Sequence, residues 1–499
     1  MSSIRVTYTG LISFIIGITS VITGFIFTLI ITRQLTPDEF GTWSLIGVLV
    51  GYVFLLHPIV NYWTTREIVR GVESGKTAFV TSNIFSVIAI LAYLLIVNFY
   101  GTQTTVNEDI LIIAALLIPV EFLRNVLNSI TSGFKPQFVE YGFIAYESSK
   151  IPIGFILIYF LDMGLMGAII TTVLSSLVSI VILFSTSFEK IKGQFNSNYL
   201  KKWLKLFWIP TYPSISTTII DTDIVIYSMM TGSFTGIAYW SAAKAISRIV
   251  RHSIKMNSAL YPKLLAGGKN EYLQENLLKV FYFAFPLSAL SLAFAEPGLF
   301  ALNPLYRIAT FVILFMVPII FIRQLGNVFQ VSLMGREKVD IKEESTFKDY
   351  IKSTLFYLPT LLIIQRVGYI ASLSVLLFLL VPTKISEIEL VTYWAILLLI
   401  AEVPLTSYLY LLVRREFFPI LDSKSILKYL FTSIMIFGLI YFLMKQYLLY
   451  TESIFEFLPP VLGFLALGIS GYLGITYLID SKTRLLFMGI INEIKNKHM

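Results

Sequence analysis

The sequence contains no cysteine and only three histidines among its 499 residues. The absence of cysteine excludes disulfides, thiolate metal sites and cysteine nucleophiles. The histidines, His57, His252 and His498, are scattered along the chain and form no metal-binding motif. The sequence therefore carries no signature of a thiol enzyme or of a histidine-ligated metalloenzyme, and we predict no cofactor.

Charged residues are also scarce, at 14% of the chain, whereas 56% of the residues are hydrophobic and the mean hydropathy is +0.78. These values are typical of a polytopic membrane protein rather than of a soluble domain with an anchor. The longest polar stretches lie near residues 186–206 and 333–352. Neither is long enough for a separate catalytic or nucleotide-binding domain, so any chemistry must take place within the helices or at their ends.

Windows of about 20 apolar residues predict an all-α polytopic membrane protein with about 14 transmembrane helices. The predicted spans cover residues 9–32, 41–63, 78–100, 110–133, 138–161, 163–185, 207–230, 236–260, 279–297, 306–332, 353–381, 389–413, 426–449 and 458–480.

Basic residues divide unequally between alternate loops of this topology. Of the 30 lysines and arginines in the loops, 26 fall in one set, and the other set holds only Arg33, Arg307, Lys384 and Lys445. The positive-inside rule therefore places both termini in the cytoplasm. The same loops account for the net charge of +8, so we predict no nucleic-acid partner.

Four cations, which we call the cationic stripe, recur inside the predicted eighth span. Lys244, Arg248, Arg251 and Lys255 follow one another at spacings of four, three and four residues. On a regular α-helix they fall within a sector of roughly 60°. Facing lipid, each would cost on the order of 2.5–3.5 kcal/mol near the bilayer centre. We therefore predict that the stripe lines a hydrated cavity that accepts an anion.

Two short segments imitate enzyme motifs. Gly71–Thr77 reads GVESGKT, but its glycine spacing is one residue shorter than in a P-loop, so we interpret it as a loop with turn glycines. Asp221 and Asp223 imitate the DxD motif of sugar-nucleotide transferases, yet they lie within an apolar span. We expect these carboxylates to bind a coupling cation or to balance the cationic stripe.

Further polar residues lie inside predicted spans. Glu121 and Arg124 are three residues apart and are expected to neutralise each other. Arg323 begins a polar face, suited either to glycan hydroxyls or to helix packing, together with Gln324, Asn327 and Gln330.

Two segments resemble the Wzx-type polysaccharide flippases, whose MOP superfamily also contains the lipid II flippases and the MATE exporters. The first, RQLTPDEFGTWSL, matches the family pattern R-x-L-x-x-x-x-F-G with Arg33, Leu35, Phe40 and Gly41. The second, GIAYWSAAKAISRIVRHSIK, matches G-x-Y-x-x-A more loosely, with Gly236, Tyr239 displaced by one position, and Ala242. The resemblance covers roughly the first 340 residues.

The resemblance implies two pseudo-symmetric six-helix bundles with two additional C-terminal helices. The first bundle then comprises residues 1–185, followed by a basic cytoplasmic linker at 186–206. The second bundle comprises 207–413, and residues 414–499 hold the two additional helices and a cytoplasmic tail.

The resemblance also implies a transporter rather than an enzyme, located in the cell membrane and acting as a monomer. Its expected substrate is a polyprenyl phosphate or pyrophosphate that carries an oligosaccharide, moved from the cytoplasmic to the outer leaflet by alternating access. The expected substrate-binding residues are Lys244, Arg248, Arg251, Lys255, Arg33, Arg66 and Arg323. Membrane lipids and a coupling cation are the other expected partners.

Two alternatives remain open at this stage. A MATE-like antiporter of small molecules or ions would share the architecture, but a site for cationic drugs should be rich in carboxylates. A membrane-embedded polysaccharide polymerase or glycosyltransferase should carry a large extracytoplasmic loop with clustered acids or arginines, and the sequence contains no such loop.

Overall fold

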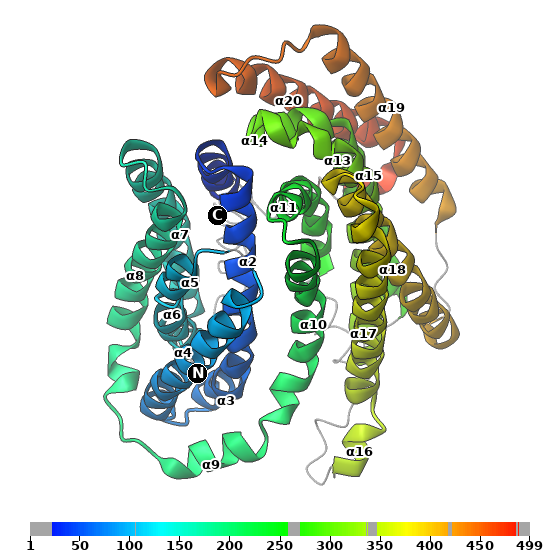
Figure 1. Ribbon diagram of the computed structural model, residues 1–499. Coiled ribbons are helices and arrows are strands. Elements are labelled where there is room, and N and C mark those ends of the chain that lie inside the picture. The colour runs from blue at the N-terminus through cyan, green and yellow to red at the C-terminus, as the bar shows by residue number, and fades with distance from the viewer. Residues whose placement is uncertain are drawn as a thin grey trace. The chain divides into compact units, whose positions relative to one another are not determined.

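The computed structural model describes residues 22–104, 106–257, 270–335, 337, 347–417, 422–485 and 488. All the regular secondary structure within these ranges is helical, which confirms the predicted fold class (Figure 1). Eleven of the described helices are long and apolar enough to cross a membrane, so the chain is a multi-pass membrane protein.

The chain divides into two compact units. Unit 1 comprises residues 1–238 and 373–387, and unit 2 comprises residues 239–372 and 388–499. The predicted bundle boundary at 186–206 lies N-terminal to this division, because the helix at 208–231 belongs to unit 1. The bundle assignment by pseudo-symmetry stays a prediction.

Unit 1 begins with the helix Ile22–Gln34. Its further elements are α2 (Pro37–Val53), η1 (Phe54–Leu56), α3 (His57–Val69), α4 (Gly75–Gly101), α5 (Glu108–Ala114), α6 (Leu117–Ser132), α7 (Pro136–Gly154), the π-helix η2 (Phe155–Phe160), α8 (Gly164–Ile191), α9 (Ser197–Lys205), α10 (Trp208–Thr231) and the start of α11 (Thr235–Ser247). It also takes in the end of α17 (Thr354–Leu380) and η5 (Val381–Thr383).

Unit 2 holds the rest of α11 and most of α17, with the remaining elements of the chain. These are η3 (Arg248–Asn257), α13 (Asn270–Ala293), α14 (Ala295–Leu302), η4 (Pro304–Ala309), α15 (Thr310–Met334), α16 (Phe347–Ile351), α18 (Glu387–Phe417), α19 (Ser423–Tyr447) and α20 (Ile454–Ile479). The two last helices pack together, and α13 packs against α19, with Tyr282, Phe437 and Phe457 in their shared core.

The predicted count of about 14 spans is not confirmed, and the three differences have separate causes. The first predicted span extends into residues 1–21, outside the described residues. The seventh corresponds to α10, a 24-residue helix that carries two aspartates and is less apolar than the eleven spans. The eighth corresponds to α11 and η3, where the helix type changes at Arg248.

The boundaries of α2 and α10 follow from local sequence. Thr36 and Glu39 form a capping box at the N-terminus of α2, and Pro37 occupies the first turn, where its missing N–H does no harm. Gly232 ends α10 in the left-handed conformation with φ of 68°, which few other residues adopt at low cost. The short turn that follows leads directly into α11.

The GVESGKT segment is a packing turn, as interpreted from the sequence. A helix, α3, precedes it rather than the strand of a P-loop, and Gly71 adopts a φ of 82°. A Cβ at Gly75 would lie 2.4 Å from the carbonyl oxygen of Lys190, so only glycine permits this close approach. The segment therefore packs against the last turn of α8.

Candidate functional site

The cationic stripe begins on α11 and continues onto a 3₁₀-helix. After Ser247 the backbone changes from α to 3₁₀ geometry, so residues three apart eclipse one another at about 120° per residue. Burial follows this period of three along η3. Ser247, Val250 and Ser253 are buried, whereas Arg248 and Arg251 are exposed.

The stripe therefore differs from the predicted α-helical one. Lys244, which is half-buried, lies about 40° from Arg248 across the last α-helical turn. The side chain of Lys255 lies outside the described residues, so its place in the cationic stripe stays a prediction. We call Lys244, Arg248 and Arg251 the cationic face.

The opposite side of η3 is fixed by packing. The 3₁₀-helix contacts α13 and α15, and Val250 is completely buried. The hydroxyls of Ser247 and Ser253 donate to the carbonyls of Ala243 and Val250, so both of these buried hydroxyls have an acceptor. The packing holds the cationic face away from the core of unit 2.

A second group of charges lies among the spans of unit 1. On α6, Arg124 pairs with Glu121 at 2.5 Å, as the sequence predicts, and its guanidinium lies 4.6 Å from the ring centroid of Tyr146 on α7. Ser176 on α8 donates a 2.8 Å hydrogen bond to Glu121. Three helices therefore meet at this ion pair.

The same group includes an ion pair on α7 that the sequence analysis did not assign. Lys150 lies 2.7 Å from Glu147, and both residues are buried. Thr23, on the helix Ile22–Gln34, donates to Glu147, and the Lys150 ammonium lies 4.3 Å from the Tyr146 ring. The i, i+3 spacing of Glu147 and Lys150 in the sequence could have predicted this ion pair. The two pairs, which we call the charge network, balance to zero net charge.

The two predicted aspartates on α10 differ in how far they are buried. Asp223 is 4% exposed and accepts a 2.8 Å hydrogen bond from the backbone N–H of Ile224. Asp221 is only half-buried. Residues two positions apart project to different sides of an α-helix, which accounts for this difference. Within the described residues, no three acidic or histidine side chains gather as a metal site.

The remaining predicted arginines occupy separate places. Arg33 is half-buried near the end of the first helix, and Arg66 is exposed on α3 with its guanidinium 3.9 Å from the ring centroid of Tyr62. Arg323 on α15 pairs with Glu402 on α18 at 2.6 Å. Glu402 was missed because 79 residues separate it from Arg323. Arg33 and Arg66 belong to unit 1, whereas Arg323 and the cationic face belong to unit 2.

The two segments that carry the family resemblance meet inside unit 1. The hydroxyl of Thr235 donates to Asp38, the second residue of α2. A Cβ at Gly41 would lie 1.9 Å from the carbonyl oxygen of Phe234, and one at Gly236 would lie 2.1 Å from the Tyr227 hydroxyl. Both motif glycines are therefore required for close packing. We call this contact the α2–α11 contact.

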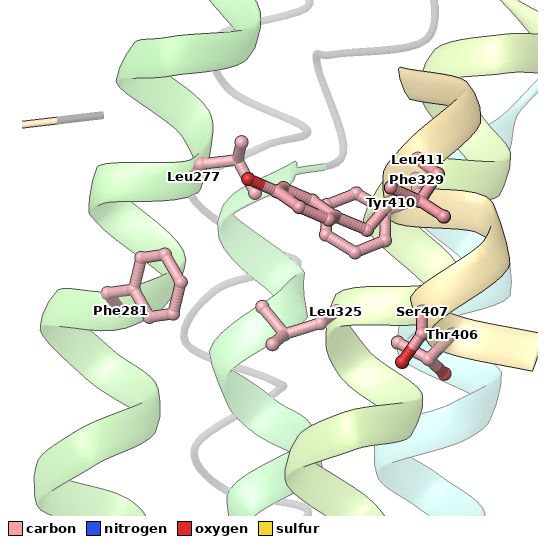
Figure 2. Close-up of a pocket in the computed structure, with 8 residues that line it drawn as sticks. All are labelled: Leu277, Phe281, Leu325, Phe329, Thr406, Ser407, Tyr410 and Leu411. Atoms are coloured by element: carbon pink, nitrogen blue, oxygen red, sulfur yellow. The ribbon is translucent and has the colours of Figure 1, made fainter. Parts of the chain in front are cut away.

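A cavity of about 400 Å³ lies in unit 2 between α13, α15 and α18 (Figure 2). It is lined by Leu277, Phe281, Leu325, Phe329, Thr406, Ser407, Tyr410 and Leu411. None of these residues is charged, and all belong to helices that can span a membrane. The cavity suits hydrocarbon rather than an anion.

No protein-family model and no curated protein matches the sequence. Solved structures share the fold. An inward-facing multidrug resistance MATE family transporter of the MOP superfamily aligns with a TM-score of 0.59 and 15% identity over 79% of this chain and 95% of that one. MATE in complex with MaL6 aligns with a TM-score of 0.52 and 15% identity over 83% and 96%.

The straight conformation of MATE aligns similarly, with a TM-score of 0.51 and 15% identity over 83% of this chain and 95% of that one. At such identity the similarity shows the fold alone. The chain has the fold of the MATE transporters of the MOP superfamily, as the sequence resemblance predicts.

Proposed function

We propose that this protein is a flippase that moves a polyprenyl-phosphate- or pyrophosphate-linked oligosaccharide from the cytoplasmic to the outer leaflet of the cell membrane by alternating access. The cationic face carries the proposal. It presents Arg248 and Arg251 on the exposed side of a helix whose other side is packed against two further helices. Arginines bind phosphate through strong, often bidentate, charge-assisted hydrogen bonds.

The chemistry of the substrate fits this arrangement. The polyprenyl tail stays in the hydrocarbon of the bilayer, so the protein has to accommodate only the phosphate and the sugars. Arg248 and Arg251 hold the phosphate in this proposal, and Lys244 receives it nearer the outer mouth. A covalent step is not required, and the transporter class agrees with the fold.

Other predicted residues take supporting roles. Arg66, near the predicted cytoplasmic end of α3, attracts the anion, and Arg33 releases it on the outer side. Asp221 and Asp223 bind a coupling cation or balance the cationic face. Arg323, already paired with Glu402, contacts sugar hydroxyls with its remaining donors.

The α2–α11 contact supports a state that is closed on the outer side. Under the predicted topology, Asp38 follows the first span and Thr235 precedes the eighth, so both residues lie on the outer side of the membrane. Under the predicted bundle assignment they also belong to different bundles. Opening toward the outside would then require the hydrogen bond between them to break.

A MATE-like exporter of small molecules is the second candidate, because the solved structures with this fold include a multidrug resistance transporter. The cationic face argues against cationic drugs as substrates, since like charges repel. The charge network contains carboxylates, but each is already paired with a cation. An anionic substrate is therefore the better fit.

The test is a head-group translocation assay in proteoliposomes with fluorescent polyprenyl-linked sugars. We expect Arg248→Ala and Arg251→Ala each to lower the rate at least tenfold, because each removes a phosphate donor. Arg415→Ala, which removes an exposed arginine at the end of α18, is the matched control and should leave the rate unchanged.

Two results separate the candidates. Equal translocation with and without wild-type protein would reject the flippase. Efflux of a cationic dye from the same vesicles, with wild-type protein but not with empty membranes, would favour the MATE-like exporter instead.

A further inference from the structure

The helix α9 connects α8 to α10 (Figure 1). A buried tryptophan anchors it to the rest of unit 1. Trp203 is completely buried, and its indole N–H donates a 3.3 Å hydrogen bond to Glu67 at the end of α3. The ammonium of Lys202 lies 3.3 Å from the same carboxylate oxygen. Because Glu67 is itself buried, the two donors to its Oε1 offset part of the cost of burying this carboxylate.

Two further anchors hold the chain that leads into the N-terminus of α9. The backbone N–H of Asn196 donates a 2.9 Å hydrogen bond to the hydroxyl of Thr77, the last residue of the GVESGKT segment. Gly75 of the same segment contacts the carbonyl of Lys190. The side chain of Asn196 also caps α9 through the N–H of Asn198. These contacts fix which side of α9 faces away from the protein.

The outward side of α9 combines cations with apolar side chains. Lys201 and Lys205 are exposed, and at 100° per residue they project within about 40° of each other. Leu204 lies about 60° from Lys201 on the same side and is 46% exposed. Phe195 and Phe207, on either side of the helix in sequence, are 44% and 48% exposed. We call this set the α9 outward face.

The position of α9 limits what can reach this face. α8 is a membrane span that ends at Ile191, and α10, predicted to span, begins at Trp208. The intervening chain therefore lies within a few residues of the membrane surface, on the side that the positive-inside rule assigns to the cytoplasm. Residues 189–207 contain five lysines and one glutamate. The local charge favours an anionic partner.

We propose that the α9 outward face binds the anionic head groups of phospholipids in the cytoplasmic leaflet. Lysines next to exposed leucine and phenylalanine match the boundary between head groups and acyl chains, where a cation meets phosphate and an apolar side chain meets hydrocarbon. An acidic protein would match the lysines but would leave the apolar side chains in water. This inference does not depend on the transported substrate.

The absence of cysteine makes a direct test simple. Asn198→Cys, an exposed position on α9, gives a single site for a fluorophore in the full-length protein. The labelled protein is reconstituted in vesicles that contain an equal mole fraction of spin-labelled phosphatidylglycerol or spin-labelled phosphatidylcholine. We expect at least twofold stronger quenching by the anionic lipid, and this preference should weaken at high salt.

The double variant Lys201→Gln/Lys205→Gln should equalise quenching by the two lipids. The matched control, Lys384→Gln/Lys445→Gln, removes two exposed lysines on the predicted outer side and should keep the preference. Equal quenching by both lipids in the wild-type background overturns the proposal, as does a preference that survives the Lys201→Gln/Lys205→Gln change.

Discussion

Thr235 donates a 2.5 Å hydrogen bond from its hydroxyl to Asp38, and this bond joins the start of α11 to the first turn of α2. The residues are 197 positions apart. Thr235 directly precedes Gly236, and Asp38 lies one helical turn before Gly41, the two glycines that pack closely here. The two glycines of the α2–α11 contact therefore come one from each of the segments that resemble the flippase family. Its behaviour during transport can be tested directly.

A cross-link at this contact should stop transport. In the cysteine-free chain, Asp38→Cys/Thr235→Cys places two thiols where the side chains now meet, and a short bifunctional thiol reagent should join them. If the outer side must open, the cross-linked protein loses at least 90% of its translocation rate and regains it when a reducible linker is cleaved. Proteoliposome translocation before and after reduction measures this.

The control is a cross-link within one predicted bundle. Thr131 and Ser187 lie 2.9 Å apart between α6 and α8, so Thr131→Cys/Ser187→Cys should be joined without loss of transport. Full transport by the cross-linked Asp38→Cys/Thr235→Cys protein would contradict a gating role for the α2–α11 contact.

Gly41→Ala should destabilise the protein by about 1–3 kcal/mol, because the added methyl group overlaps the Phe234 carbonyl and the backbone must move. Gly47 lies on the same helix with open space around its Cβ position. Gly47→Ala should therefore be neutral or stabilise by up to about 1 kcal/mol, through helix propensity. Thermal unfolding in detergent measures both, and equal midpoints for the two variants would contradict the packing argument.

Local spacing allowed part of the site to be predicted from the sequence. Glu121 and Arg124 pair as expected because an i, i+3 ion pair depends only on the helix that carries it. The cationic face was found for the same reason. The change of helix type at Arg248 was not predicted, because α- and 3₁₀-helices use neighbouring backbone angles, and here the packing of η3 on α13 and α15 accompanies the 3₁₀ form.

Long-range partners could not be predicted in this way. Glu67 and Trp203 are 136 residues apart, and nothing in either segment specifies the other. The same holds for Arg323 and Glu402. The all-helical membrane fold was predictable because an apolar segment of about 20 residues matches the thickness of the bilayer. Side-chain pairing depends instead on how the helices pack.

Lys150→Met should be strongly destabilising, by about 3–5 kcal/mol, because it leaves the buried Glu147 carboxylate without its cation. The hydrogen bond from Thr23 remains, but a single neutral donor does not replace an ammonium group. Thermal unfolding in detergent measures the change.

The double variant Glu147→Gln/Lys150→Met is the matched control for this pair. Removing both charges should recover most of the lost stability, since the penalty comes from the uncompensated carboxylate rather than from lost attraction. If the double variant is as unstable as Lys150→Met, the loss arises from packing, and the charge network is not the cause.

Lowering the pH should destabilise the packing of α19 against α20, because it protonates Asp480. Burial acts to raise the pKa of Asp480, but hydrogen bonds from the Tyr429 hydroxyl at 2.8 Å and from the N–H and hydroxyl of Thr483 at 3.0 Å outweigh it and lower this pKa below its usual value. The native state therefore prefers the ionised carboxylate. Its stabilisation is complete above the unfolded-state pKa near 4 and is lost as the pH falls through the lower folded-state value.

Asp422, at the N-terminus of α19, acts in the same direction, because its hydrogen bond with Lys482 lowers its pKa. We expect the thermal unfolding temperature of the wild-type protein to decrease when the pH is lowered from 6 to 3. Asp480→Asn should reduce this decrease. Glu73→Gln, which alters an exposed carboxylate in unit 1, should leave the pH dependence unchanged.

Hydrogen exchange should detect the loss of stability at low pH first at residues 476–484. These residues include the acceptor, Asp480, and the donor Thr483, whose hydrogen bonds weaken on protonation. An identical pH dependence in Asp480→Asn and wild type would show that the junction is held by packing alone.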